Sequence, residues 1–151
     1  MKQQDFETLL ADTTKQINGH ITWKQDEDHS PTVEFKVDVI SLAKYPIFVK
    51  GSYNLLAQTL TYALIHQAFG RIYALDLGKD HHNPSCSNVG RKHKHRWNEI
   101  FRDKEAYVPN DITALVSDPI DVWKQFCNEA FLIHNGEMRP PPPLQLDLEL
   151  F

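Results

Sequence analysis

Half of the eight histidines of this chain lie between positions 81 and 95, among basic residues. Residues 79–96 contain five Lys or Arg against one acid, Asp80, so this stretch has a formal charge of +4 in a chain of −4. The remainder of the chain therefore carries −8. Positive charges this close together repel one another, and such a cost suggests a purpose. We therefore expect the segment to bind an anion or a metal ion. We call residues 76–97 the basic histidine segment.

One chemistry open to these residue types is cleavage of RNA without a metal. Attack of a ribose 2′-hydroxyl on its own phosphate needs a base, an acid and cations, and imidazole can fill either proton-transfer role. The acid and base candidates, not assigned further, are His81, His82, His93 and His95. The candidates for binding phosphate are Lys79, Arg91, Lys94 and Arg96. Aromatic rings that would stack on RNA bases are Trp97, Tyr73 and Tyr107.

A second chemistry is a metal site, with zinc as the first candidate. In a strand, His93 and His95 would share one face, and the basic residues between and beside them would share the other. His82 and Asp76 would complete a tetrahedral shell, with Asp80 or Cys86 as substitutes. The spacing lacks the paired pattern typical of structural zinc, so no cofactor is the first expectation and zinc the alternative. A third interpretation is a solvated basic loop whose charges pair with nearby acids.

The elements that must position these residues are predicted from hydrophobic periodicity. Residues 5–18 place an apolar stripe on one side of a helix, and Asn18-Gly19 would end it. Strands are expected at residues 19–24, 32–40, 46–53, 58–66 and 71–77, and alternation is clearest in 32–40. Residues 78–90 read as a loop because of their Pro, Asn and Gly content, and 92–97 as a short strand or the start of a helix.

A second helix is expected to begin at Asp118, with Pro119 in its first position, and to end at Asn135-Gly136. These elements predict an α+β fold: a five-stranded antiparallel β-meander with an N-terminal and a C-terminal helix packed on one face. Residues 1–139 would form one domain. Residues 140–151 would form a proline-rich linker and a strand-like tail that could pair with this chain or with a neighbouring chain.

Composition limits the possible classes of protein. A hydrophobic content of 41% and a charged content of 24% are typical of a soluble globular domain. No apolar run is long enough for a transmembrane helix, and residues 1–20 lack a secretory signal pattern. The two cysteines, Cys86 and Cys127, are too few for a disulfide framework, so a cytoplasmic location is expected. The acidic balance disfavours broad coating of nucleic acid, whereas the local basic segment can bind phosphates.

Several motifs resemble an uncharacterised family of small prokaryotic proteins. They are Asp76-Leu-Gly-Lys-Asp-His-His-Asn-Pro, Gly90-Arg-Lys-His-Lys-His-Arg-Trp, Phe101-Arg-Asp-Lys-Glu-Ala-Tyr-Val-Pro and Val122-Trp-Lys-Gln-Phe-Cys. The resemblance spans roughly residues 70–135 and brings no established activity.

A more distant similarity is to TumE-type toxins of toxin–antitoxin modules. Those proteins have a strand ending near an Arg/Tyr-Asp, then a His-His-Pro-like turn and a Lys-His segment. Here Tyr73-Ala-Leu-Asp76, His81-His82-Asn83-Pro84 and His93-Lys94-His95 stand in the same order. The resemblance implies a growth-inhibiting toxin that acts on RNA and is neutralised by a protein antitoxin. The contrasting interpretation is a nonenzymatic mobile-element or phage inhibitor that binds a host defence complex.

Overall fold

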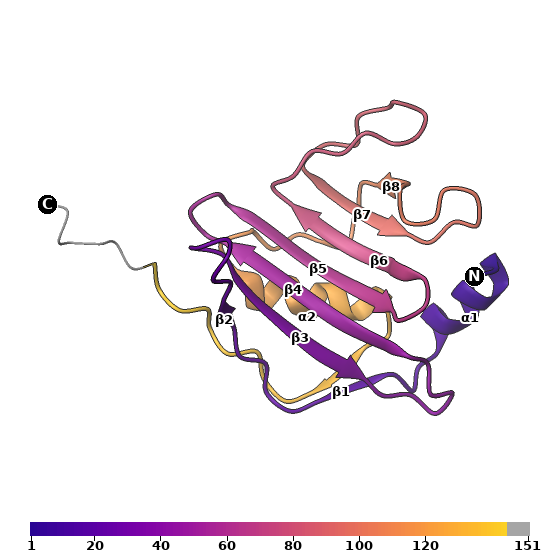
Figure 1. The fold of residues 1–151 in the computed structure, drawn as a ribbon, viewed down its shortest axis with the longest axis horizontal. Coiled ribbons are helices and arrows are strands. Elements are labelled where there is room, and N and C mark those ends of the chain that lie inside the picture. The colour runs from indigo at the N-terminus through magenta and orange to yellow at the C-terminus, as the bar shows by residue number, and fades with distance from the viewer. Residues whose placement is uncertain (145–151) are drawn as a thin grey trace, which may run out of the picture.

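One seven-stranded antiparallel sheet organises the molecule, and its strands lie side by side in chain order (Figure 1). In this computed structural model, which describes residues 1–144, the strands are β2 (Lys24–Gln25), β3 (Val33–Val39), β4 (Ile47–Asn54), β5 (Thr59–His66), β6 (Gly70–Leu77), β7 (Lys92–Arg96) and β8 (Ala106–Tyr107). Two further strands, β1 (Gln16–Asn18) and β9 (Ile133–Asn135), form a separate parallel pair. The helices are α1 (Gln3–Ala11) and α2 (Pro119–Glu129).

The four central strands lie where alternation predicts them. β3, β4, β5 and β6 begin and end within one residue of the expected ranges. In β3, Val33, Phe35 and Val39 are buried, whereas Glu34 and Lys36 between them are exposed. The α+β class and the antiparallel meander are therefore confirmed.

The predicted number of five strands in the meander is wrong, because the sheet has seven. Residues 19–24 do not form the expected strand; only Lys24 and Gln25 pair with β3. At the other edge, β7 and β8 extend the sheet beyond β6. The two-residue strands β2 and β8 are too short to carry a period of two, so no pattern in the sequence marks them.

The first helix is shorter than the predicted range 5–18, because α1 ends at Ala11. The Asp12 carboxylate accepts hydrogen bonds from the backbone N–H and the hydroxyl of Thr14, both at 2.7 Å, which favours a turn. The buried Lys15 ammonium then donates to the carbonyl oxygens of Leu9 and Leu10, each at 2.8 Å. These bonds satisfy carbonyls that a longer helix would use, so the chain leaves the helix and forms β1.

The second helix begins as predicted and ends early. The Asp118 side chain accepts a hydrogen bond from the Asp121 N–H at 3.3 Å. α2 ends at Glu129 rather than Asn135, because Phe131 adopts a left-handed φ of 51° and the Leu132 N–H donates to the Cys127 carbonyl at 3.0 Å. This is a Schellman end, and it lacks the glycine that usually signals one.

The main core lies between the sheet and α2, which Figure 1 shows behind β4 and β5. The ring of Tyr62 on β5 lies 5.1 Å from Trp123 and 5.6 Å from Phe126 between centroids, and Tyr73 on β6 stacks on Phe126 at 5.1 Å. α1 lies beside the end of β7, where the Gln3 N–H donates to Glu99 at 2.6 Å. α2 packs on one face of the sheet. Packing of α1 on the same face stays a prediction.

Neither helix of residues 1–144 has the length and apolar character needed to cross a bilayer. The predicted strand-like tail falls almost wholly on residues 145–151, which lie outside the described residues.

Candidate functional site

The histidines of β7 lie on the face of the sheet opposite α2, which we call the open face. Lys94, between them, points to the other side, where its ammonium contacts Glu129 of α2 at 3.2 Å and Asp111 at 2.6 Å. Because side chains alternate along a strand, His93 and His95 point away from α2. Both rings are nevertheless buried.

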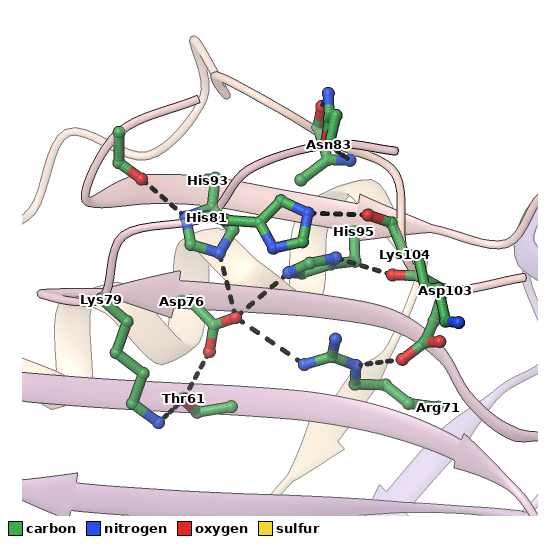
Figure 2. A network of polar contacts seen from close by, with 12 residues as sticks. Thr61, Arg71, Asp76, Lys79, His81, Asn83, His93, His95, Asp103 and Lys104 are labelled. Carbon is green, nitrogen blue, oxygen red and sulfur yellow. Dashed lines mark hydrogen bonds and ion pairs between the residues drawn. The ribbon is translucent and has the colours of Figure 1, made fainter. Parts of the chain in front are cut away.

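Asp76 lies beside these two rings on the neighbouring strand, β6, where it is paired in register with His93. Its carboxylate accepts a hydrogen bond from the Thr61 hydroxyl of β5 at 2.6 Å. One of its oxygens, Oδ2, lies 3.2 Å from Nε2 of His93 and 3.3 Å from Nε2 of His95 (Figure 2). Three strands thus each contribute to one buried polar cluster.

Arg71 reaches the same cluster because of a bulge in β6. Simple alternation places residues 71 and 76 on opposite faces of the sheet. The register shifts here, so that Leu64 pairs with Tyr73 and Ile65 with Arg71, which leaves Ile72 without a partner in the ladder. The Arg71 guanidinium therefore lies on the open face, 3.7 Å from Asp76 and 2.9 Å from the Asp103 carboxylate.

The loop between β6 and β7 brings a third imidazole over the open face. Nε2 of His81 donates to the Lys104 carbonyl at 2.7 Å. The side chain of Asn83 makes two hydrogen bonds with the backbone of Ala106, at 2.9 and 2.8 Å, which fasten the loop to β8. At the base of the loop Gly78 has a φ of +84°, and a Cβ there would lie 2.1 Å from a backbone oxygen, so only glycine fits.

The three rings converge. Their centroids are 5.3 Å apart for His81 and His93, 4.6 Å for His81 and His95, and 4.9 Å for His93 and His95. One ring nitrogen of each lies within 4.8 Å of the other two. Within residues 1–144 this is the single group of three His, Cys, Asp or Glu side chains whose ligand atoms lie so close together.

A backbone carbonyl holds the other nitrogen of each ring. Nδ1 of His93 lies 2.9 Å from the Gly90 oxygen, and Nδ1 of His95 lies 2.7 Å from the Asp103 oxygen. A carbonyl only accepts, so both Nδ1 atoms carry hydrogen, and each Nε2 holds either a second hydrogen or a lone pair for a metal. His81 has the mirrored tautomer, with hydrogen on Nε2. Metal-binding histidines are usually oriented by such carbonyl bonds.

The two distances from Asp76 to the imidazoles fit an edge of a tetrahedral metal shell as well as they fit hydrogen bonds. Ligand atoms about 2.0–2.2 Å from a tetrahedral zinc ion lie about 3.3–3.6 Å from one another. The separations of 3.2 and 3.3 Å from Asp76 to the two Nε2 atoms are close to that edge length. His81, His93 and His95 therefore form a group of three ligands whose chemistry suits zinc, and Asp76 lies at a suitable distance from two of them.

Asp76 stays a carboxylate at neutral pH. Its burial, with 6% of the residue exposed, by itself raises the pKa. Hydrogen bonds from His93, His95 and Thr61 and the charge of Arg71 outweigh burial and hold the pKa of Asp76 well below its ordinary value. Asp76 thus supplies a negative charge beside the imidazoles, next to the positive charge of Arg71.

The remaining candidates from the loop lie around this cluster. Lys79 donates to the Thr61 hydroxyl at 3.0 Å and so borders it. Arg91 is exposed and donates to the Gly78 carbonyl at 3.0 Å. His82, chosen as a ligand from the sequence, is exposed and forms a backbone bridge with Asn88, while its neighbour His81 holds the place in the cluster.

Two of the predicted phosphate ligands lie on the side of β7 that faces α2. Lys94 is fully buried between two carboxylates. Arg96 binds Glu7 of α1 at 3.1 Å. Both are separated from the imidazoles by the sheet.

The aromatic candidates are covered by protein. Tyr73 and Trp97 are buried, and the Trp97 indole N–H donates to the Met1 carbonyl at 3.0 Å. Tyr107 is half-buried, and its hydroxyl donates to Glu129 at 2.8 Å.

Sequence reasoning missed Thr61, Arg71 and Asp103. Thr61 and Arg71 join the cluster through strand register and a bulge. Asp103 joins through its backbone oxygen, which binds His95, and its carboxylate, which binds Arg71, so no motif marks any of them.

No curated protein and no solved structure matches the chain. The model of a family described as "Family of unknown function (DUF6978)" matches residues 1–131, which include the whole seven-stranded sheet and the histidine cluster. The match confirms the expectation of an uncharacterised family, while the similarity to TumE-type toxins stays a prediction. The chain belongs to this family of unknown function.

Proposed function

We propose that the protein binds one divalent transition-metal ion, zinc first, through His81, His93, His95 and Asp76. The observation that carries the proposal is the convergence of three imidazoles, two of which contact the Asp76 carboxylate, with a backbone carbonyl holding the far nitrogen of each ring. Four protein ligands complete a tetrahedral shell, as in structural zinc sites. The ion would fasten the loop that carries His81 to strands β6 and β7.

The hydrogens on the rings are arranged as a metal ion requires. Backbone carbonyls hold the hydrogen on Nδ1 of His93 and of His95, which leaves the Nε2 atom of each ring directed into the cluster. With a metal ion, both rings would direct an Nε2 lone pair at the ion.

The test is the metal content of the purified full-length chain, with His81→Ala as the variant and His82→Ala as the matched control. We expect about one zinc per chain, lost in His81→Ala and retained in His82→Ala, since the exposed His82 lies outside the cluster. Cobalt(II) substitution should produce the visible spectrum of a tetrahedral ion. Wild-type protein that neither contains nor binds zinc or cobalt would refute the proposal.

A second candidate is metal-independent cleavage of RNA, with growth inhibition and a protein antitoxin as its biological setting. What favours it is the partial exposure of His81, which follows Lys79 by two positions in the loop, whereas His93 and His95 are each 1% exposed. His81 is then the imidazole within reach of a phosphate.

RNA cleavage in the presence of a strong chelator separates the two candidates. The ribonuclease should turn over without metal, and His81→Ala should abolish turnover while RNA affinity survives. Absence of turnover at every protein purity would reject this candidate and would suit a nonenzymatic binding protein.

A further inference from the structure

The open face carries a second distinctive group, on the strands beyond the histidine cluster. Cross-strand register places Lys36, Lys50, Ala63, Ala74 and His95 in one row across β3 to β7. Directly paired residues share a face of the sheet, so the two lysines stand on the same surface as the imidazoles. Ala63 and Ala74 lie between the lysines and His95 in this row, and their short side chains extend little above the sheet.

A hollow of about 710 Å³ lies over this part of the sheet. Besides the two lysines, its walls include residues 20–22 and Lys24, which precede β3. They also include the polar side chains of Glu34, Ser52 and Thr61 and the apolar side chains of Ala63 and Ile65. Pockets for small ligands usually measure about 300–1,000 Å³ and combine apolar surface with a few polar groups. The hollow therefore has the size and lining of a site for a nucleotide-sized molecule.

The lysine pair supplies a place for an anion. Lys36 and Lys50 are exposed and directly opposite each other, an arrangement that destabilises a sheet because like charges repel. Across residues 1–144, neither ammonium has a carboxylate within 4.0 Å. The Lys36 ammonium instead lies 4.3 Å from the ring centre of Phe48. A phosphate between the two ammonium groups would remove the repulsion.

We propose that this hollow binds a nucleotide unit, with its phosphate held between Lys36 and Lys50 and its sugar and base over Ala63 and Ile65. The hydroxyl of Ser52 stands at the same surface to meet the polar edge of the ligand. The proposal depends on neither candidate function. It does place the ligand beside the histidine cluster, because Thr61 both lines the hollow and donates to Asp76.

The experiment measures binding of adenosine 5′-monophosphate by calorimetry and of a fluorescein-labelled short single-stranded RNA by anisotropy. The full chain is compared with the double variant Lys36→Gln/Lys50→Gln and with Lys124→Gln, an exposed lysine of α2. The double variant should bind about tenfold or more weakly, as expected from the loss of charge-assisted hydrogen bonds to phosphate. Lys124→Gln should bind as the wild type does.

Competition identifies the source of the nucleotide. Displacement of the RNA by adenosine 5′-monophosphate indicates a free mononucleotide as occupant, and RNA binding that the mononucleotide does not displace indicates a strand; both support the proposal. Equal displacement by inorganic phosphate would overturn it, as would a double variant that binds like the wild type or wild-type protein that binds neither probe saturably. Binding that persists in chelator would separate this site from the proposed metal centre.

Discussion

At the scale of residues, the metal proposal depends on how Asp76 is oriented. The Thr61 hydroxyl donates to Oδ1 of Asp76 at 2.6 Å, which leaves Oδ2 toward the imidazoles. Loss of such an outer hydrogen bond typically weakens metal binding by about 10–100-fold. We therefore expect Thr61→Val to bind zinc about 10–100-fold more weakly in competition with a chromophoric chelator.

The matched control is Thr59→Val, because Thr59 belongs to the same strand and lies outside the cluster. Thr59→Val should bind zinc as the wild type does. Equal zinc affinity of Thr61→Val and the wild type would show that Asp76 does not need this bond, and would count against Asp76 as a ligand.

The types and spacing of the site residues could be predicted from the sequence, whereas their arrangement in space could not. A His-Lys-His sequence in a strand places two imidazoles on one face, and this is what β7 does with His93 and His95. The choice between His81 and His82 depends on the path of a loop, which no periodicity fixes. Arg71 illustrates the same limit, because the bulge at Ile72 reverses the face that alternation assigns to it.

At the scale of elements, Lys15 determines where α1 ends. Its ammonium is fully buried and donates to the carbonyls of Leu9, Leu10 and Asp12. Lys15→Met would leave buried carbonyls without donors, which typically costs about 1–3 kcal/mol in the free energy of unfolding. Urea unfolding should show this loss, whereas Lys124→Met, at an exposed position of α2, should leave stability nearly unchanged. A Lys15→Met variant as stable as the wild type would contradict this account of the helix end.

The elements that could be predicted are those with a clear hydrophobic pattern in their own residues. β3 to β6 each have seven or eight residues, long enough for a period of two to identify the buried face. The ends of both helices depend instead on features that no periodicity marks: the bonds of the Lys15 ammonium to carbonyls of α1, and the left-handed backbone conformation of Phe131. β1 and β9 pair across more than a hundred residues of chain, so neither carries a local signal of its partner.

At the scale of the whole molecule, the sheet separates two kinds of surface. One face packs Tyr62 and Tyr73 against α2, while the other carries the histidine cluster and the lysine pair in continuous cross-strand rows. The two proposed sites share Thr61 as a neighbour. A ligand in the hollow would therefore lie against the same strand that orients Asp76.

Asp76 also links stability of the whole fold to pH. Although burial alone raises its pKa, the hydrogen bonds and Arg71 hold the pKa of Asp76 below the value of about 3.9 for an unfolded aspartate. The folded state then binds fewer protons than the unfolded chain, so the stabilisation is complete above about pH 5 and is lost as pH falls through about 4 and below.

We expect the free energy of unfolding of the metal-free wild type to fall between pH 6 and pH 3, measured with urea in the presence of a chelator. Hydrogen bonds from Thr14 lower the pKa of Asp12, so Asp12 also contributes to the fall in the free energy of unfolding with decreasing pH. Asp76→Asn should be less stable at pH 6 and should lose less stability on acidification, since the amide has no proton to gain. Asp80→Asn, an exposed loop variant, should keep the wild-type slope. Identical slopes for Asp76→Asn and the wild type would mean that the imidazoles and Arg71 do not stabilise this carboxylate, and the cation site would lose its electrostatic basis.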